Sequence, residues 1–247
     1  DEHTSRGLGD VYKRQGLFLY LGYAHTDREM AHMMTSSIIF SSAVRMPVFD
    51  HLTPVNSRSH YEIEHSFDYA LTWKGNIFGN LETSIGLNGF RQSGNPYSYT
   101  FRGDLSGYRT DGENIELLYV PSIDDPNVIY SDGFDTDAFE QFLQDSGLSA
   151  YRGTAVPRNS FNSPWAGTFD LRIAQELPFG GGVPGKATFF LDIENVLNLI
   201  NSDWGGFENY VGSTSNSRGI VEAEVDDQGR YVYKTFKIDG EPTQNIG

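Results

Sequence analysis

The residues of this sequence that could bind an ion or a ligand are mainly carboxylates, and they gather in one segment. Residues 94–164 contain eleven acidic side chains against four arginines. Carboxylate and hydroxyl oxygens are the ligands that Ca²⁺ prefers in proteins. Four residues offer such oxygens close together along the chain: Asp104, Ser106, Asp111 and Glu113. Their spacing does not match an EF-hand loop, so a solvated acidic surface is favoured over a cation site.

Two further acids of this segment, Asp124 and Asp125, are direct neighbours. They resemble a general acid and a general base only in composition, because neighbouring side chains on an extended chain point to opposite sides. Together with the acids above, they complete the set of candidate contacts for a ligand or a cation. This set is Asp104, Asp111, Glu113, Asp124 and Asp125.

Residue patterns for other chemistry are weak. The six histidines include no i, i+4 pair that would bind a metal from one helix, and there is no cysteine to complete a zinc site. Ser160 and Ser163 lack the sequence context of a nucleophile elbow. We therefore expect no enzyme activity, no bound metal and no cofactor.

The charge balance restricts the partners of the protein. The chain has 18 Lys and Arg residues against 33 Asp and Glu residues, a formal net charge of -15. Nucleic acid is disfavoured as a partner, since phosphate contacts need clustered Lys and Arg. An acidic surface instead suits a cation, a basic ligand, or a lipopolysaccharide layer bridged by divalent ions.

The elements that position these residues are expected to be long strands. In residues 61–74, apolar side chains such as Phe67, Leu71 and Trp73 alternate with polar ones. This alternation predicts a strand with one apolar face and one polar face. About 14 residues is more than twice the usual strand length. Tilted by about 40°, such a strand rises roughly 30 Å, close to the apolar band of an outer-membrane barrel.

Four other segments alternate in the same way and complete the predicted sheet. They are residues 16–26, 77–88, 165–177 and 186–194. Short turns are predicted at Gly75–Asn76 and at residues 178–185, whereas the other connections between the predicted strands are long. In outer-membrane barrels the short turns are periplasmic and the long loops are extracellular. The sequence therefore predicts an all-β fold, a partial antiparallel transmembrane β-barrel of about five long strands with long extracellular loops.

One short helix is expected inside the loop at residues 94–164. Asp137 is predicted to cap its start, Glu140 to complete a capping box, and Gly147 to end it. Its apolar stripe is expected to pack on Leu148 or Tyr151 of the same loop. Packing within the loop is favoured over contact with a ligand.

Several short motifs resemble a known family in their order and spacing. They lie at residues 93–100, 118–121, 151–153, 157–160, 169–177 and 192–198. Together they resemble the carboxyl-terminal barrel of TonB-dependent outer-membrane receptors, in particular the Oar-like group, over nearly all of the chain after Gly16. Asn195 and Asn198 are similar to the Asn, apolar, apolar, Asn pattern that ends the penultimate strand of many such receptors. We interpret these two residues as structural.

The resemblance implies uptake of a scarce substrate across the outer membrane of a Gram-negative bacterium. Such receptors are barrels of about 22 strands, plugged by an amino-terminal domain and driven by the TonB complex from the inner-membrane proton gradient. The implied partners are membrane lipid and lipopolysaccharide, the TonB complex, and a small-molecule or peptide substrate. A passive outer-membrane channel and a secreted carbohydrate-binding or adhesin protein are the alternatives.

Residues 1–15 are expected to lie outside the fold. Residues 10–15 resemble a translated library-adapter sequence, and the stretch lacks both an apolar core segment and a strand period. We expect it to be an adapter-derived or disordered segment, with the natural protein beginning upstream. Residues 16–247 would then form a partial barrel that lacks the plug and the final strand.

Overall fold

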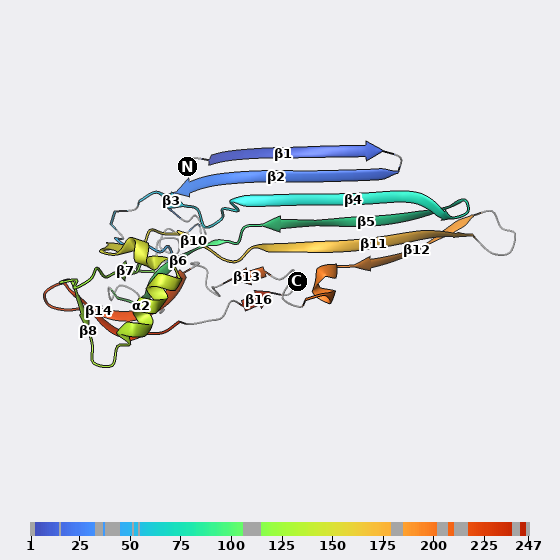
Figure 1. Cartoon of the computed structure of the whole chain (residues 1–247). Coiled ribbons are helices and arrows are strands. Elements are labelled where there is room, and N and C mark those ends of the chain that lie inside the picture. Colours follow the sequence, from blue (N-terminus) through green and yellow to red (C-terminus); the bar gives the residue numbers. More distant parts are fainter. Residues whose placement is uncertain are drawn as a thin grey trace.

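The computed structural model confirms that the chain is mostly β-sheet, and the residues that it describes contain one α-helix. It describes residues 3–14, 16–32, 37, 45–50, 52–53, 55–105, 115–178, 185–201, 207–209, 217–238 and 243–245. Two larger units stand out in Figure 1: a sheet of long strands and, at one end of it, a smaller unit that contains the helix. We call these units the long sheet and the cap.

The long sheet is antiparallel throughout, and it contains all five strands that the sequence predicts. Its order is β1 (His3–Arg14), β2 (Leu17–Met30), β4 (His65–Phe78), β5 (Leu81–Gln92), β11 (Ala166–Pro178) and β12 (Lys186–Ile193). The two-residue strand β3 (Ser57–Arg58) pairs with the end of β2. The cap lies at the end of the long sheet opposite the short β4–β5 turn (Figure 1).

The predicted position of the turn between β4 and β5 is wrong. The chain turns at Gly79 and Asn80, whereas Gly75 and Asn76 lie inside β4. Gly79 has a φ of +65°, a conformation that glycine adopts without steric cost. Residues 61–64, expected to begin the strand, instead form a linker in which the Glu62 side chain is buried.

The prediction that residues 1–15 form no strand is also wrong. β1 pairs with β2 along its whole length, from His3 opposite Arg28 to Arg14 opposite Leu17. Antiparallel pairing joins backbone N–H and C=O groups and does not require alternating side chains. A stretch without a period can therefore still extend the sheet.

Apolar side chains of neighbouring strands lie on the same face of the long sheet. Leu71 of β4 is opposite both Leu19 of β2 and Leu87 of β5, and Leu87 is in turn opposite Leu171 of β11. Residues directly opposite each other point to the same side of a sheet. Because the register holds over these strands, the separate apolar faces combine into one continuous surface, which we call the apolar face.

Neither face of the long sheet is covered by other parts of the described chain. From β2 to β12, Met30, Thr83 and Ala166 are the buried residues of its long strands. Large apolar side chains are instead exposed, among them Leu21 (51 %), Phe189 (63 %) and Leu191 (46 %). Monomeric soluble proteins rarely leave such a large apolar surface open.

The cap is built on a second sheet, with the order β10 (Phe161–Asn162), β6 (Pro96–Arg102), β14 (Ser217–Val225), β15 (Tyr231–Phe236) and β8 (Val128–Tyr130). It also contains α2 (Thr136–Asp145), the 3-10 helix η1 (Leu148–Tyr151), and the pair β7 (Tyr119–Val120) and β9 (Thr154–Ala155). The remaining elements are the 3-10 helix η2 (Val196–Leu199) and the pair β13 (Phe207–Asn209) and β16 (Thr243–Asn245). Residues 198–247, for which the sequence predicts no strand, contribute β14 and β15 to the second sheet.

The main hydrophobic core of the described residues lies in the cap. Phe139 and Leu143 of α2 are fully buried against residues of the second sheet that include Phe101 and Tyr233. Leu148 belongs to the same cluster, so the helix packs within its loop as predicted, and on the second sheet as well. The cap thus has the buried interior that the long sheet lacks.

The predicted helix cap is shifted by two residues. Asp135 rather than Asp137 precedes the helix, and its carboxylate accepts a hydrogen bond from the Ala138 N–H. This is the usual N-cap contact with the third helical residue. Gly147 follows the helix with a φ of +78°, as predicted. Within the described residues, no helix is long and apolar enough to cross a bilayer.

Candidate functional site

The long sheet and the cap meet at a junction where hydrogen bonds link distant segments. Arg158 Nη2 donates to the carbonyl oxygens of Met30 (2.6 Å) and Val55 (3.3 Å). The next residue, Asn159, donates from its side chain to the Arg58 carbonyl at 2.7 Å. Residues 157–160 are therefore hydrogen-bonded to the end of β2 and to residues 55–58, which follow β2 in the chain.

The other side of the junction depends on the chain between β5 and β6. The backbone N–H of Ser93 donates to the His65 carbonyl at 2.8 Å, and its hydroxyl accepts from the His65 N–H at 3.1 Å. A Cβ atom on Gly94 would lie 2.1 Å from the Ser163 carbonyl oxygen, so glycine is required there. Ser98 and Asn159 exchange hydrogen bonds of 2.9 and 3.1 Å inside the cap.

These contacts involve the same segments that carry the family resemblance. Residues 93–100 and 157–160 meet at the junction, and residues 118–121 and 151–153 belong to the cap. Leu118 N–H bonds to the Tyr99 carbonyl at 3.0 Å, and Gly153 N–H bonds to the Val120 carbonyl at 2.7 Å. Short motifs that are far apart in the sequence therefore form one connected region.

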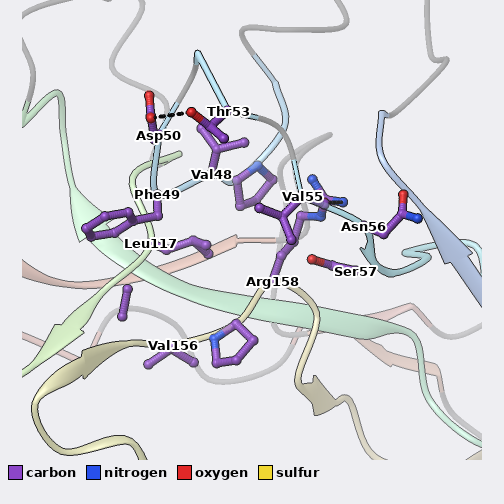
Figure 2. Close-up of a pocket in the computed structure, with 13 residues that line it drawn as sticks. Val48, Phe49, Asp50, Thr53, Val55, Asn56, Ser57, Leu117, Val156 and Arg158 are labelled. Carbon is purple, nitrogen blue, oxygen red and sulfur yellow. Dashed lines mark hydrogen bonds between the residues drawn. The ribbon is translucent and has the colours of Figure 1, made fainter.

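A pocket of about 500 Å³ opens at the junction (Figure 2). This volume falls in the range of small-molecule sites. The lining comes from the segment between β2 and β4 and from the cap, and it is largely apolar. Its residues are Pro47, Val48, Phe49, Asp50, Thr53, Val55, Asn56, Ser57, Leu117, Ala155, Val156, Pro157 and Arg158. Phe49 and Val55 are 62 % and 66 % exposed, so apolar surface continues beyond the pocket.

Arg158 supplies the positive charge of this pocket. Its side chain is 4 % exposed and its guanidinium lies beside Val55 (Figure 2). Burial lowers the pKa of Arg158. Within the described residues it donates to carbonyl groups and contacts no carboxylate, and its Nε atom has no hydrogen-bond partner. The pocket therefore combines apolar walls with one guanidinium that, among the described residues, is not paired with a carboxylate.

His60 is, after Arg158, a second buried basic side chain at the junction. Its pKa is lowered from 6.5 to about 4, first by burial and then by the charges of Arg158 and Arg28. The folded protein therefore keeps His60 neutral at neutral pH.

Acid should loosen the junction through His60. Unfolding would return this histidine to a pKa near 6.5, so between about pH 6.5 and 4 the unfolded chain binds more protons than the folded chain. The thermal unfolding midpoint should accordingly fall as the pH is lowered through this window. His60→Gln should reduce that fall, because the variant cannot take up the proton. Parallel pH profiles of the two proteins would contradict the assignment.

The structure brings Asp124 and Asp125 to one polar pocket of about 550 Å³, which Glu140 and Arg152 also line. The prediction that these two acids point apart assumed an extended chain, whereas Asp124 lies in a turn with a φ of +56°. Burial raises the pKa of Asp125, but hydrogen bonds from Ser122, Tyr119 and the Asn127 N–H outweigh it and hold the pKa at about 2. Asp125 is therefore ionised and holds the turn.

The remaining candidate residues are distributed differently. Asp104 follows β6 and is partly exposed, whereas Asp111 and Glu113 lie outside the described residues. Asn195 has a φ of +50° and precedes η2, where its carbonyl accepts from the Asn198 N–H at 2.9 Å. The positions of these two asparagines agree with a structural role at the end of β12.

Sequence reasoning missed one cluster with metal-binding chemistry. His25 of β2 and His65 of β4 are directly opposite each other, and Glu64 adjoins them. Histidines that pair across two strands have no fixed spacing along the chain, so the i, i+4 spacing of a helix does not reveal them. A register between residues 16–26 and 61–74 would have revealed this pair.

Comparison of the chain with protein-family models, curated proteins and solved structures finds no match. Its function is therefore inferred from its own residues and their arrangement.

Proposed function

We propose that this chain forms part of the wall of an outer-membrane β-barrel, in a TonB-dependent receptor of the Oar-like kind that imports a scarce substrate. The observation that carries the proposal is the apolar face, on which side chains from β2 to β12 line up and no other described part of the chain covers them. Lipid is the partner that suits such a face, because it covers apolar side chains without specific contacts. The opposite face would line the lumen.

Strand length supports a membrane location. β2 and β4 have 14 residues each, β11 has 13 and β5 has 12. A transmembrane strand needs about 9–11 residues at a tilt of about 45°. The four strands are long enough to cross a bilayer and to extend a few residues beyond it.

The opposite face of the sheet has the polar character expected of a lumen. It carries Asp68, Asn88, Asp170 and Arg172, with Asn88 directly opposite Asp170. Aromatic residues gather on the apolar face near the cap, where Tyr23, Phe67 and Trp165 form a row of ring contacts. Such aromatic girdles mark the membrane interfaces of barrels.

The arrangement of the connections supports an orientation. The Gly79–Asn80 turn lies at one end of the long sheet and the cap lies at the other (Figure 1). Short periplasmic turns and long extracellular loops are the rule in bacterial barrels. In this proposal the cap faces the outside, and the Arg158 pocket at its base contacts the arriving substrate.

Cysteine labelling tests this topology, and the chain has no cysteine of its own. Asp132 in the cap and Asn80 in the turn are both exposed, so without a membrane both would react equally. In intact Gram-negative cells, Asp132→Cys should react with a membrane-impermeant maleimide, and Asn80→Cys should react only after lysis. Both variants labelled in the lysate provide the matched control.

The other outcomes separate the competing functions. Labelling of Asn80→Cys alone in intact cells would invert the barrel. Labelling of both variants, with the protein released into the medium, would favour the secreted carbohydrate-binding or adhesin alternative. A membrane-bound protein that conducts ions in planar bilayers without TonB would favour the passive channel.

A further inference from the structure

The end of the long sheet that adjoins the cap holds a group of metal-ligating side chains. His25 and His65 are paired across β2 and β4, and Glu64 directly precedes His65. One nitrogen from each histidine and one carboxylate oxygen from Glu64 all lie within 4.8 Å of one another. We propose that His25, Glu64 and His65 bind a first-row divalent metal ion of the Zn²⁺ type.

Hydrogen bonds orient both imidazole rings for this role. His25 Nδ1 lies 3.0 Å from the Glu64 carbonyl oxygen, which can only accept a hydrogen bond. His25 therefore carries its proton on Nδ1, and its Nε2 keeps the lone pair that a metal needs. His65 Nδ1 is bonded to the Tyr23 hydroxyl at 3.0 Å, so its Nε2 is likewise the ring nitrogen that faces the cluster. A histidine ligand held through its second nitrogen is the common arrangement in metal sites.

The Glu64 carboxylate is also held in place. Arg58 Nη2 donates to Glu64 Oε2 at 2.8 Å, and Arg58 is itself bonded to Glu62. The other oxygen, Glu64 Oε1, lies 3.4 Å from His65 Nε2. Ligands about 2.0–2.1 Å from a tetrahedral zinc ion are separated by roughly 3.3 Å. This pair already has the required spacing, and the His25 nitrogen lies within 4.8 Å of both atoms.

The local charge favours a cation. A pocket of about 370 Å³ beside the cluster is lined by Asp27, Glu29, Glu62 and Glu64 against a single guanidinium, that of Arg58. One of the four carboxylates is a proposed ligand, and the excess of negative charge would attract a divalent ion from solution.

The donor set selects the class of metal. Two imidazoles and one carboxylate suit zinc, copper, nickel or iron, whereas calcium and magnesium prefer sites built entirely of oxygen. Three protein ligands leave a fourth position for water. Because the ligands come from two strands and from the linker, the bound ion would tie β2 to β4 at the junction.

Zinc titration by calorimetry tests the site on the full chain in detergent micelles. The expected result is one Zn²⁺ ion per chain, with an affinity at least about tenfold weaker in His25→Gln and in His65→Gln. His32→Gln is the matched control, since His32 is exposed and lies outside the cluster. Calcium should not compete. Absence of binding to the original chain, or equal weakening by all three substitutions, would overturn the proposal.

A second measurement leaves all three ligands intact, in case the histidine variants do not fold. The Trp165 ring stacks on His65 with ring centroids 6.0 Å apart, close enough for a bound Cu²⁺ ion to quench its fluorescence. In a Trp73→Phe, Trp204→Phe variant, Trp165 is the remaining tryptophan. One equivalent of Cu²⁺ should quench its emission, and removal of the copper by excess EDTA should restore it. Emission that is unchanged by copper would show that the ring cluster is structural and binds no metal.

Discussion

Replacing Leu71 with arginine should cost about 2–4 kcal/mol of folding free energy in a lipid bilayer. Leu71 lies near the middle of β4, between Leu19 and Leu87 on the apolar face. In the proposed barrel an arginine at this position would project into the hydrocarbon core, where its charge loses hydration. Reversible unfolding of the protein in lipid vesicles by guanidinium chloride would measure the loss.

The neighbouring residue provides the matched control. The Thr72 side chain lies on the polar face of the sheet. Its cross-strand partner on β5 is Gly86, so a longer side chain has space there. In the proposed lumen an arginine there stays hydrated and should cost much less than Leu71→Arg. Equal losses for the two variants in lipid would mean that the two faces have been assigned wrongly.

Replacing Phe139 with alanine should have the largest effect within the cap, a loss of about 3–5 kcal/mol. The Phe139 ring is fully buried, and its centroid lies 5.3 to 5.9 Å from the rings of Phe134, Tyr233 and Phe236. Alanine would remove these contacts and leave a cavity between α2 and the second sheet. Hydrogen–deuterium exchange of peptides from α2 and β15 would report the loss locally.

The control for this prediction is another apolar residue of the cap. Ile123 is 82 % exposed, so Ile123→Ala should change the free energy of opening measured by amide exchange by less than about 0.5 kcal/mol. Exchange in β4 and β5 should stay unchanged in both variants, because the cap core does not extend into the long sheet. If Phe139→Ala left α2 fully protected, the described cap core would be wrong.

The turn between β4 and β5 shows how far local sequence specifies this fold. The dipeptide Gly-Asn occurs twice between Trp73 and Leu81, at residues 75–76 and 79–80, and either copy is a suitable turn. The two choices differ by four residues, an even number, so a plain two-residue turn at either copy would pair odd-numbered residues with even-numbered ones. In both cases an irregularity such as the one between Gly75 and Phe78 is needed before Leu71 and Leu87 share a face. Alternation therefore cannot choose between them. In the structure the second copy forms the turn, with β4 in register with β2 and β5.

The sequence by itself determined the features that depend on neighbouring residues. These are the all-β class, the apolar and polar sides of the long strands from β2 to β12, the start of β12 at Lys186, and the helix that ends before Gly147. Each follows from a period or a capping residue within a few positions of the chain, which acts before any distant contact forms.

Tertiary structure alone decided which distant segments meet. β14 pairs with β6 although more than a hundred residues separate them, Arg158 bonds to Met30, and His25 faces His65. No local period specifies such partners, because they depend on the register of whole strands and on the way the cap closes around α2. The junction pocket and the histidine pair are products of that register, and for this reason the candidate sites emerged only when the chain was folded.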